Sequence, residues 1–164
     1  MRAGFSLAIA MALATAGCAT SSSEPERVVL LDPARGSALL QTCSRAPLTG
    51  ASNFFTLAPA EITAMETRLA QLFAFQTRDI GPAANFAVDP SSYRREYVGY
   101  TARGERMIYG NFVPVGVASD QVPTVVCDGG PAFFGVEYAI EPRVVRAVRF
   151  DTSFAGQTVQ DIEQ

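Results

Sequence analysis

The sequence contains no histidine, and its 13 basic residues are all arginine, so lysine is absent as well. Without an imidazole, the chain cannot build a Ser-His-Asp or Cys-His catalytic site, or a zinc site that needs a histidine ligand. This absence excludes the mechanisms of most hydrolases. We attribute the exclusive use of arginine to the nucleotide composition of the source genome, although arginine is also the better bidentate partner for carboxylates.

The sequence also lacks an excess of positive charge, because 16 acidic residues outnumber 13 basic ones and give a formal net charge of -3. A chain of this charge has no basic field to attract nucleic acid, and we expect no such partner. Carboxylates are too sparse around the loop at Asp128 to indicate calcium. We expect no metal and no cofactor.

The first 18 residues, MRAGFSLAIAMALATAGC, are typical of an export signal. Arg2 is the only charge before an apolar run over residues 5–14, and small residues follow, which is the order of regions in a secretory signal. The run is too short to cross a bilayer, since a transmembrane helix needs roughly 20 mostly apolar residues. We expect the export machinery to remove it.

The end of this segment, Thr15-Ala16-Gly17-Cys18, resembles the lipobox of bacterial lipoprotein precursors. The resemblance implies that Cys18 receives a diacylglycerol, that residues 1–17 are cut off, and that the new amino terminus is acylated, for example with palmitate. Thr15 departs from the pattern, in which leucine is usual. Ala19 follows the cysteine, and by analogy with diderm lipoproteins the absence of aspartate there favours the outer membrane, with the domain facing the periplasm.

Two other interpretations of this segment remain open. The tripeptide Ala14-Thr15-Ala16 also fits the small-x-small site of an ordinary signal peptidase, which would release a soluble protein that begins near Gly17. Alternatively, the apolar run is a buried segment of the fold.

Three cysteines are present, and two remain if Cys18 carries the lipid. In an exported chain, Cys43 and Cys127 then form an even pair that predicts a disulfide. Because the bond would close a long loop, it would lower the entropy of the unfolded chain and stabilise the fold by about 4 to 5 kcal/mol. The alternative is two separate thiols, and without histidine neither is expected to be catalytic.

Beyond the signal, the chain has the length of one domain. We divide it into a signal peptide (residues 1–17), the lipidated cysteine with a flexible tether (18–36), a single α+β domain (37–156) and a polar tail (157–164). The tether is inferred from the small, polar, serine-rich composition of residues 19–27. Residues 28–31 fit either an edge strand or the end of the tether.

The clearest predicted element is a helix over residues 59–75, whose apolar residues recur on one face: Ile62, Met65, Leu69, Leu72 and Phe73. The later pattern predicts strands at residues 93–101, 106–113, 122–127, 133–140 and 144–150. We expect an α+β fold, with this main amphipathic helix packed on an antiparallel sheet of about four or five strands. The element order is reminiscent of cystatin-like folds by analogy only, and without a Gln-x-Val-x-Gly loop no inhibitory function is carried over.

The most distinctive local sequence is Asp128-Gly129-Gly130, directly after Cys127. Two glycines allow backbone amides to converge on a ligand, and a neighbouring disulfide would hold the loop still. Glycines between strands more often form a bulge or a tight turn, and we favour that role. Contact with a ligand or partner through Asp128, Gly129, Gly130 and Phe133 is the alternative.

Four arginines surround the first predicted hairpin, whose turn lies at residues 102–105: Arg94, Arg95, Arg103 and Arg106. Because arginine holds a carboxylate through two parallel hydrogen bonds, such a group could bind a carboxylate-bearing glycan or peptide. The simpler interpretation is a solvated strand face that protects an edge of the sheet.

Aromatic residues crowd the predicted sheet: Tyr93, Tyr97, Tyr100, Tyr109, Phe112, Phe133, Phe134 and Tyr138. Simple alternation puts Tyr93, Tyr97 and Tyr109 on one face, with Tyr100 and Phe112 partly on the other. We expect most of them in the core, and an exposed aromatic patch for a partner is the alternative for the rest.

We interpret the chain as a membrane-anchored bacterial envelope lipoprotein whose domain binds an envelope protein or glycan and is not an enzyme. One alternative is a secreted or periplasmic inhibitor of a hydrolase that uses the Asp128 loop. Another is a glycan-acting enzyme with Glu96, Glu137 or Asp128 as acid and base, which needs two carboxylates facing one cleft at about 5 to 10 Å.

Overall fold

The computed structural model describes residues 27–41, 43, 45, 48–75, 81–117, 122–151 and 158–159. The predicted signal peptide and Cys18, together with residues 19–26 of the tether and most of the tail, lie outside these residues. The described helices and strands are β1 (Val28–Leu30), α1 (Gly36–Leu39), β2 (Ala51–Phe55), α2 (Pro59–Phe75), α3 (Asn85–Val88), β3 (Tyr93–Ala102), β4 (Glu105–Pro114), β5 (Gly130–Ala139), β6 (Val144–Asp151) and β7 (Thr158–Val159). Short 3-10 turns lie at Pro33–Arg35, Gly81–Ala84, Pro90–Ser92 and Val115–Val117.

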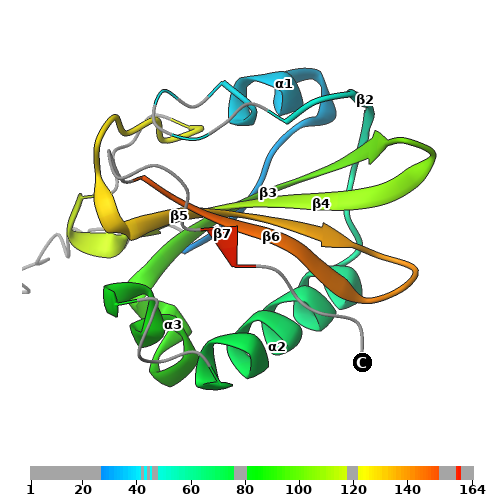
Figure 1. The fold of residues 1–164 in the computed structure, drawn as a ribbon. Helices are drawn as coiled ribbons and strands as arrows, with labels where there is room; N and C mark the ends of the chain where they lie inside the picture. The colour runs from blue at the N-terminus through cyan, green and yellow to red at the C-terminus, as the bar shows by residue number, and fades with distance from the viewer. Residues whose placement is uncertain are drawn as a thin grey trace, which may run out of the picture.

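These elements form an α+β fold around one mixed sheet, with α2 and α3 on one face and α1 on the other (Figure 1). The strand order is β1-β3-β4-β5-β6-β7, and β2 also pairs with β3. Strands β3 to β6 are antiparallel neighbours, as predicted. The sheet is not purely antiparallel, because β1 pairs with β3 in parallel. It does so along the side of β3 opposite β4.

The hairpin of β3 and β4 fixes which side chains share a face. Its turn residues Arg103 and Gly104 have φ angles of 52° and 84°, a geometry that matches the twist of paired strands. With a two-residue turn, odd positions of β3 lie opposite even positions of β4, so Tyr97 is paired with Gly110. The predicted alternation missed this offset: Tyr97 lies with Phe112 in the core under α2, and Tyr109 belongs to the opposite face.

Helix α2 has the bounds that the sequence predicted, and its buried residues are those of the predicted apolar face: Ile62, Met65, Leu69, Leu72 and Phe73. Its start is supported by Glu61, whose Oε2 accepts a hydrogen bond from the Ala58 amide at 2.8 Å. This is half of a capping box, and it compensates for the missing serine or threonine at residue 58. Among the described residues, no helix is long and apolar enough to span a membrane.

The core between α2, α3 and the sheet is aromatic. Phe112 and Phe134 stack with ring centroids 4.6 Å apart, and Phe86 of α3 meets Phe112 edge-on at 5.1 Å. All of the aromatic residues predicted to crowd the sheet are buried, each at most 9% exposed. The alternative of an exposed aromatic patch among them is therefore wrong, because both faces of the sheet are covered.

Two boundaries differ from the prediction. Val28–Leu30 pairs with β3, so the edge-strand alternative holds and the folded part begins before residue 37, inside the range assigned to the tether. At the other end, Thr158–Val159 of the predicted polar tail pairs with β6.

The strand predicted at residues 122–127 is wrong. The Thr124 amide donates to the carboxylate of Glu96 at 2.8 Å, and the Thr124 carbonyl accepts from Asn111 Nδ2 at 2.9 Å. Side chains of the sheet therefore satisfy backbone groups that a neighbouring strand would otherwise pair. Pro123 also lacks the amide that a central strand needs.

Candidate functional site

The face of the sheet opposite α2 is covered by α1 and by segments without regular structure (Figure 1). A small apolar cluster lies there: Leu31, Leu39, Val98, Tyr100, Met107, Tyr109 and Ala139. Two polar features adjoin it, a buried network of hydrogen bonds and an open pocket. Together they make this face the candidate site.

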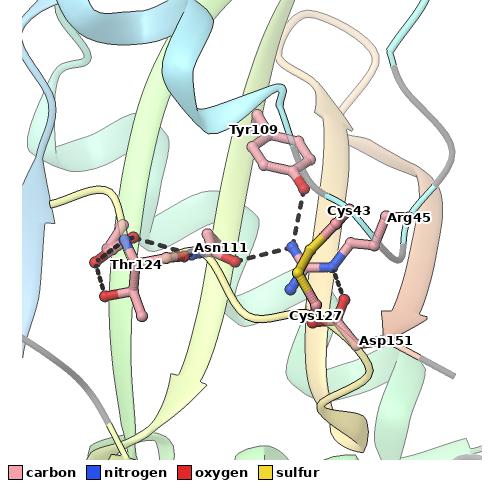
Figure 2. Close-up of polar contacts among 8 residues, drawn as sticks. Cys43, Arg45, Tyr109, Asn111, Thr124, Cys127 and Asp151 are labelled. Carbon is pink, nitrogen blue, oxygen red and sulfur yellow. Dashed lines mark hydrogen bonds and ion pairs between the residues drawn. A yellow bond between two sulfur atoms is a disulfide. The ribbon is translucent and has the colours of Figure 1, made fainter. Parts of the chain in front are cut away.

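The predicted disulfide between Cys43 and Cys127 is confirmed, with a sequence separation of 84 residues. It joins the segment before β2 to the segment before β5, and it lies beside Arg45 and Asp151 (Figure 2). Because neither cysteine lies in a helix or strand, the bond links two coil segments that cover this face.

Arg45 is the centre of one half of the buried network. Its side chain is ion-paired with Asp151 of β6, and its Nη1 donates to the Tyr109 hydroxyl at 3.0 Å and to Asn111 Oδ1 at 2.8 Å (Figure 2). Arg45 is 6% exposed and Asp151 is 1% exposed. The coil segment that carries Arg45 is thus attached to both β4 and β6.

Glu96 of β3 is the centre of the other half. It accepts hydrogen bonds from Asn111 Nδ2 at 2.9 Å, from the Thr124 amide at 2.8 Å and from the Thr124 hydroxyl at 2.8 Å. Arg94 lies within ion-pair distance, its Nε 3.4 Å from Glu96. Asn111 connects the two halves, because its amide nitrogen donates to Glu96 and its oxygen accepts from Arg45. Figure 2 shows Asn111 between Thr124 and Arg45.

Burial and the charged partners act in opposite directions on the pKa values of Arg45 and Asp151. Burial raises the pKa of Asp151 above the ordinary value, while Arg45 acts in the opposite direction. Burial lowers the pKa of Arg45, but the oxygens of Tyr109 and Asp151 outweigh that effect and the net pKa is raised. In such a buried pair each charge depends on its partner, since an uncompensated charge is costly to bury. The network therefore anchors the covering segments.

Next to the network lies a pocket of about 410 Å³. It lies toward the turn between β3 and β4, and its lining residues are Leu48, Thr49, Tyr100, Ala102, Arg103, Glu105, Met107, Glu137, Arg146, Ala147 and Arg149. It adjoins the network where Glu137 of β5 is paired with Tyr109 of β4. A pocket of this size can hold a small ligand.

Both carboxylates of the pocket are held by arginines. Glu137 accepts from Arg149 Nη2 at 2.8 Å and from the Tyr100 hydroxyl at 3.4 Å. Glu105 lies 3.0 Å from Arg146 Nη2. Burial, with a further contribution from Glu137, raises the pKa of Tyr100, so its hydroxyl keeps its proton at neutral pH.

The four predicted arginine contacts do not form one cluster. On the helix side of the sheet, Arg95 is ion-paired with Glu66 of α2 at 2.9 Å. Arg106 is 2.9 Å from Glu61 in the first turn of α2. These two arginines attach the acidic side of α2 to the sheet, which sequence reasoning did not anticipate.

The other two arginines belong to the opposite face. Arg94 is buried beside Glu96 of the network. Arg103 is exposed and lines the pocket from the hairpin turn. Of the four, only Arg103 lies where a small ligand could be bound in this pocket.

The glycine-rich loop forms a tight, packed turn. Asp128 and Gly130 have φ angles of 54° and 78°. A Cβ at Gly129 would lie 2.6 Å from the ring of Phe133, so only glycine permits this packing. Asp128 is exposed, whereas Phe133 is buried. The loop geometry agrees with the structural role that the sequence favoured.

Sequence reasoning missed most of the network, although one part could have been found. The two-residue turn places Glu96 directly opposite Asn111, so the hairpin alone predicts that pair. The pairing of Arg45 with Asp151 has no local signal. Of the carboxylates suggested as acid and base, Glu137 lines the pocket, whereas Glu96 and Asp128 do not.

Within the described parts of the chain, no group of three or more His, Cys, Asp or Glu residues is placed to hold a metal ion. No protein-family model matches the chain, and neither a curated protein nor a solved structure matches it.

Proposed function

We propose that this chain is a bacterial envelope lipoprotein, held at the membrane by lipid on Cys18, whose domain binds a ligand or partner without catalysing a reaction. The anchor is supported by the signal-like residues 1–14 and by Thr15-Ala16-Gly17-Cys18. Two or more acyl chains would hold the protein durably, since each buried methylene contributes about 0.8 kcal/mol. The tether would then confine the domain near the membrane and raise its effective concentration for envelope partners.

The observation that carries the binding role is the charge state of the pocket. Both of its carboxylates, Glu105 and Glu137, are ion-paired with arginines. Each carboxylate is thus already bound by a guanidinium of the protein, an arrangement that suits recognition through hydrogen bonds.

We also propose a likeness of architecture. Helix α2 packs on the antiparallel strands β3 to β6, an element order similar to that of cystatin-like folds. The likeness concerns element order alone and carries no function.

The anchor is tested by intact mass and detergent partitioning of the protein made in a diderm bacterial envelope. The native chain should start at Cys18, carry acyl mass and enter the detergent phase. Cys18→Ala should lose both properties, whereas Ser21→Ala, which leaves the lipobox unchanged, should keep them. An unmodified native chain that starts near Gly17 would contradict the proposal and favour a secreted protein.

A second candidate function is a glycan-acting enzyme, because Glu105 and Glu137 line the same pocket. Release of reducing ends from envelope glycans, lost in both Glu105→Gln and Glu137→Gln, would favour it over the binding role. If neither the native protein nor these variants releases any product, the binding role stands.

A further inference from the structure

The pocket on the face opposite α2 has an unequal balance of charge. Three arginines and two glutamates line it: Arg103, Arg146, Arg149, Glu105 and Glu137. Arg149 is ion-paired with Glu137, and Arg146 with Glu105. In each pair one positive and one negative charge cancel. One excess positive charge remains, and it belongs to Arg103.

Arg103 is fixed at the rim of the pocket by its backbone. It is the first residue of the two-residue turn, with a φ of 52°, and the strands on both sides of the turn are paired through Ala102 and Glu105. Among the described residues, no ion pair or hydrogen bond of its guanidinium is found. Its donors therefore face solvent at the mouth of the pocket.

The floor of the pocket is neutral. Tyr100 and Met107 are 1% and 4% exposed, and the Tyr100 hydroxyl is directed to Glu137. Leu48 and Ala102, which are partly exposed, also line the pocket and offer apolar surface to the uncharged part of a ligand. A cation has no unpaired carboxylate to meet, and a dianionic phosphate exceeds the single positive charge available.

We propose that this pocket binds a small monoanionic ligand through its carboxylate, which Arg103 holds by paired hydrogen bonds. This inference rests on the proposed binding function and specifies its ligand class. Guanidinium and carboxylate match in geometry, and hydrogen bonds between ionised groups are stronger than neutral ones. Two sources supply such a group in an envelope: an acidic sugar and the carboxyl end of a short peptide.

The test is calorimetric titration of the mature, full-length protein in detergent micelles with matched pairs of probes. Methyl glucuronide is compared with methyl glucoside, and N-acetylalanine with N-acetylalanine amide; inorganic phosphate is the fifth probe. We expect at least one carboxylate to bind and its neutral counterpart to bind at least about tenfold more weakly. The carboxylate that binds more tightly identifies the source as sugar or peptide.

The variants locate the site. Arg103→Gln should weaken carboxylate binding by at least about tenfold. Arg143→Gln is the matched control, because Arg143 is also exposed at a hairpin turn with a φ of 58°, but it does not line the pocket. Far-ultraviolet circular dichroism should be unchanged in both variants, since both side chains are exposed.

Other outcomes would overturn the inference in distinguishable ways. Equal binding of neutral probes, preference for phosphate, absence of binding, or equal effects of the two substitutions would each reject the carboxylate assignment. Product formation from methyl glucuronide would instead reject the non-catalytic function on which the assignment rests.

Discussion

On one face of the sheet, α2 and α3 cover a core of aromatic and aliphatic side chains. On the opposite face, coil segments cover a buried network that includes Arg45, Glu96 and Asp151. Burial of one large apolar side chain contributes about 1.5 to 3 kcal/mol to stability, and this contribution does not depend on the direction of any contact. The polar face instead depends on charges that stabilise only while their partners are in place. We therefore expect the covers of the two faces to be destabilised by different kinds of substitution.

We expect the largest change in the free energy of unfolding when the disulfide is removed. Cys43→Ser/Cys127→Ser should lose about 4 to 5 kcal/mol of unfolding free energy, because the unfolded chain is released from a loop that spans a separation of 84 residues. Urea unfolding measures the loss. Reductant should destabilise the native protein to a similar extent and leave the double variant unchanged; a native protein that is insensitive to full reduction would contradict this.

Removing Arg45 should break the network, because Asp151 loses its cation and Tyr109 and Asn111 lose a hydrogen-bond donor. Arg45→Met leaves Asp151 buried without its cation, so we expect a loss of about 3 to 4 kcal/mol in unfolding free energy. Asp151→Asn in the same chain should recover part of the loss. Arg35→Met is the matched control on this face, because Arg35 is exposed and its side chain, among the described residues, donates to the Val122 carbonyl and meets no buried carboxylate. Equal losses for the Arg45 and Arg35 variants would remove the distinction between the faces.

Alkaline titration tests whether the tyrosines on both faces of the sheet are buried. The pKa of each of the five tyrosines is raised, chiefly by burial, and that of Tyr93 is raised to about 12. A raised folded pKa stabilises the fold below the unfolded value and loses this contribution as the pH rises. For Tyr93 the window runs from pH 10 to about 12. Phenolate absorbance should therefore appear together with loss of circular dichroism, and a step near pH 10 in an intact fold would contradict the burial.

The smallest effect concerns the attachment of α2. Glu66 accepts from Arg95 at 2.9 Å and from the Tyr97 hydroxyl. Glu66→Gln keeps the shape and removes the charge, so we expect a loss of about 1 kcal/mol in thermal or urea unfolding. Glu105→Gln, which breaks a more exposed pair, should cost less than about 0.5 kcal/mol. The reverse order would mean that the apolar face does not depend on this contact.

The same contrast explains what the sequence could predict. The helix at Pro59–Phe75 follows from the local spacing of its apolar residues, and the turn at Arg103-Gly104 from a local glycine signal. The disulfide follows from counting cysteines. No local pattern predicts that Arg45 reaches Asp151, 106 residues away. The predicted strand at 122–127 is wrong because its β-branched residues give a strand signal, whereas the side chains of Glu96 and Asn111 bind its backbone at Thr124.

The pocket could be predicted from the sequence only in part. Arg103 was a candidate from sequence, but its separation from Arg94, Arg95 and Arg106 depends on the register of β3 and β4. Glu137 of β5 and Arg149 of β6 join the pocket through the pairing of β4 with β5 and of β5 with β6. Sequence therefore supplied the residue types, and strand pairing selected among them.

Hydrogen exchange of backbone amides in the native protein, measured at increasing urea below the unfolding transition, tests the difference between the two faces most directly. We predict that the Thr124 amide, which donates to Glu96, exchanges by a local opening of the polar face, with a lower opening free energy and a weaker dependence on urea than the amides of α2. Equal opening free energies and an equal urea dependence at Thr124 and in α2 would contradict this prediction and would mean that both faces are held as one unit.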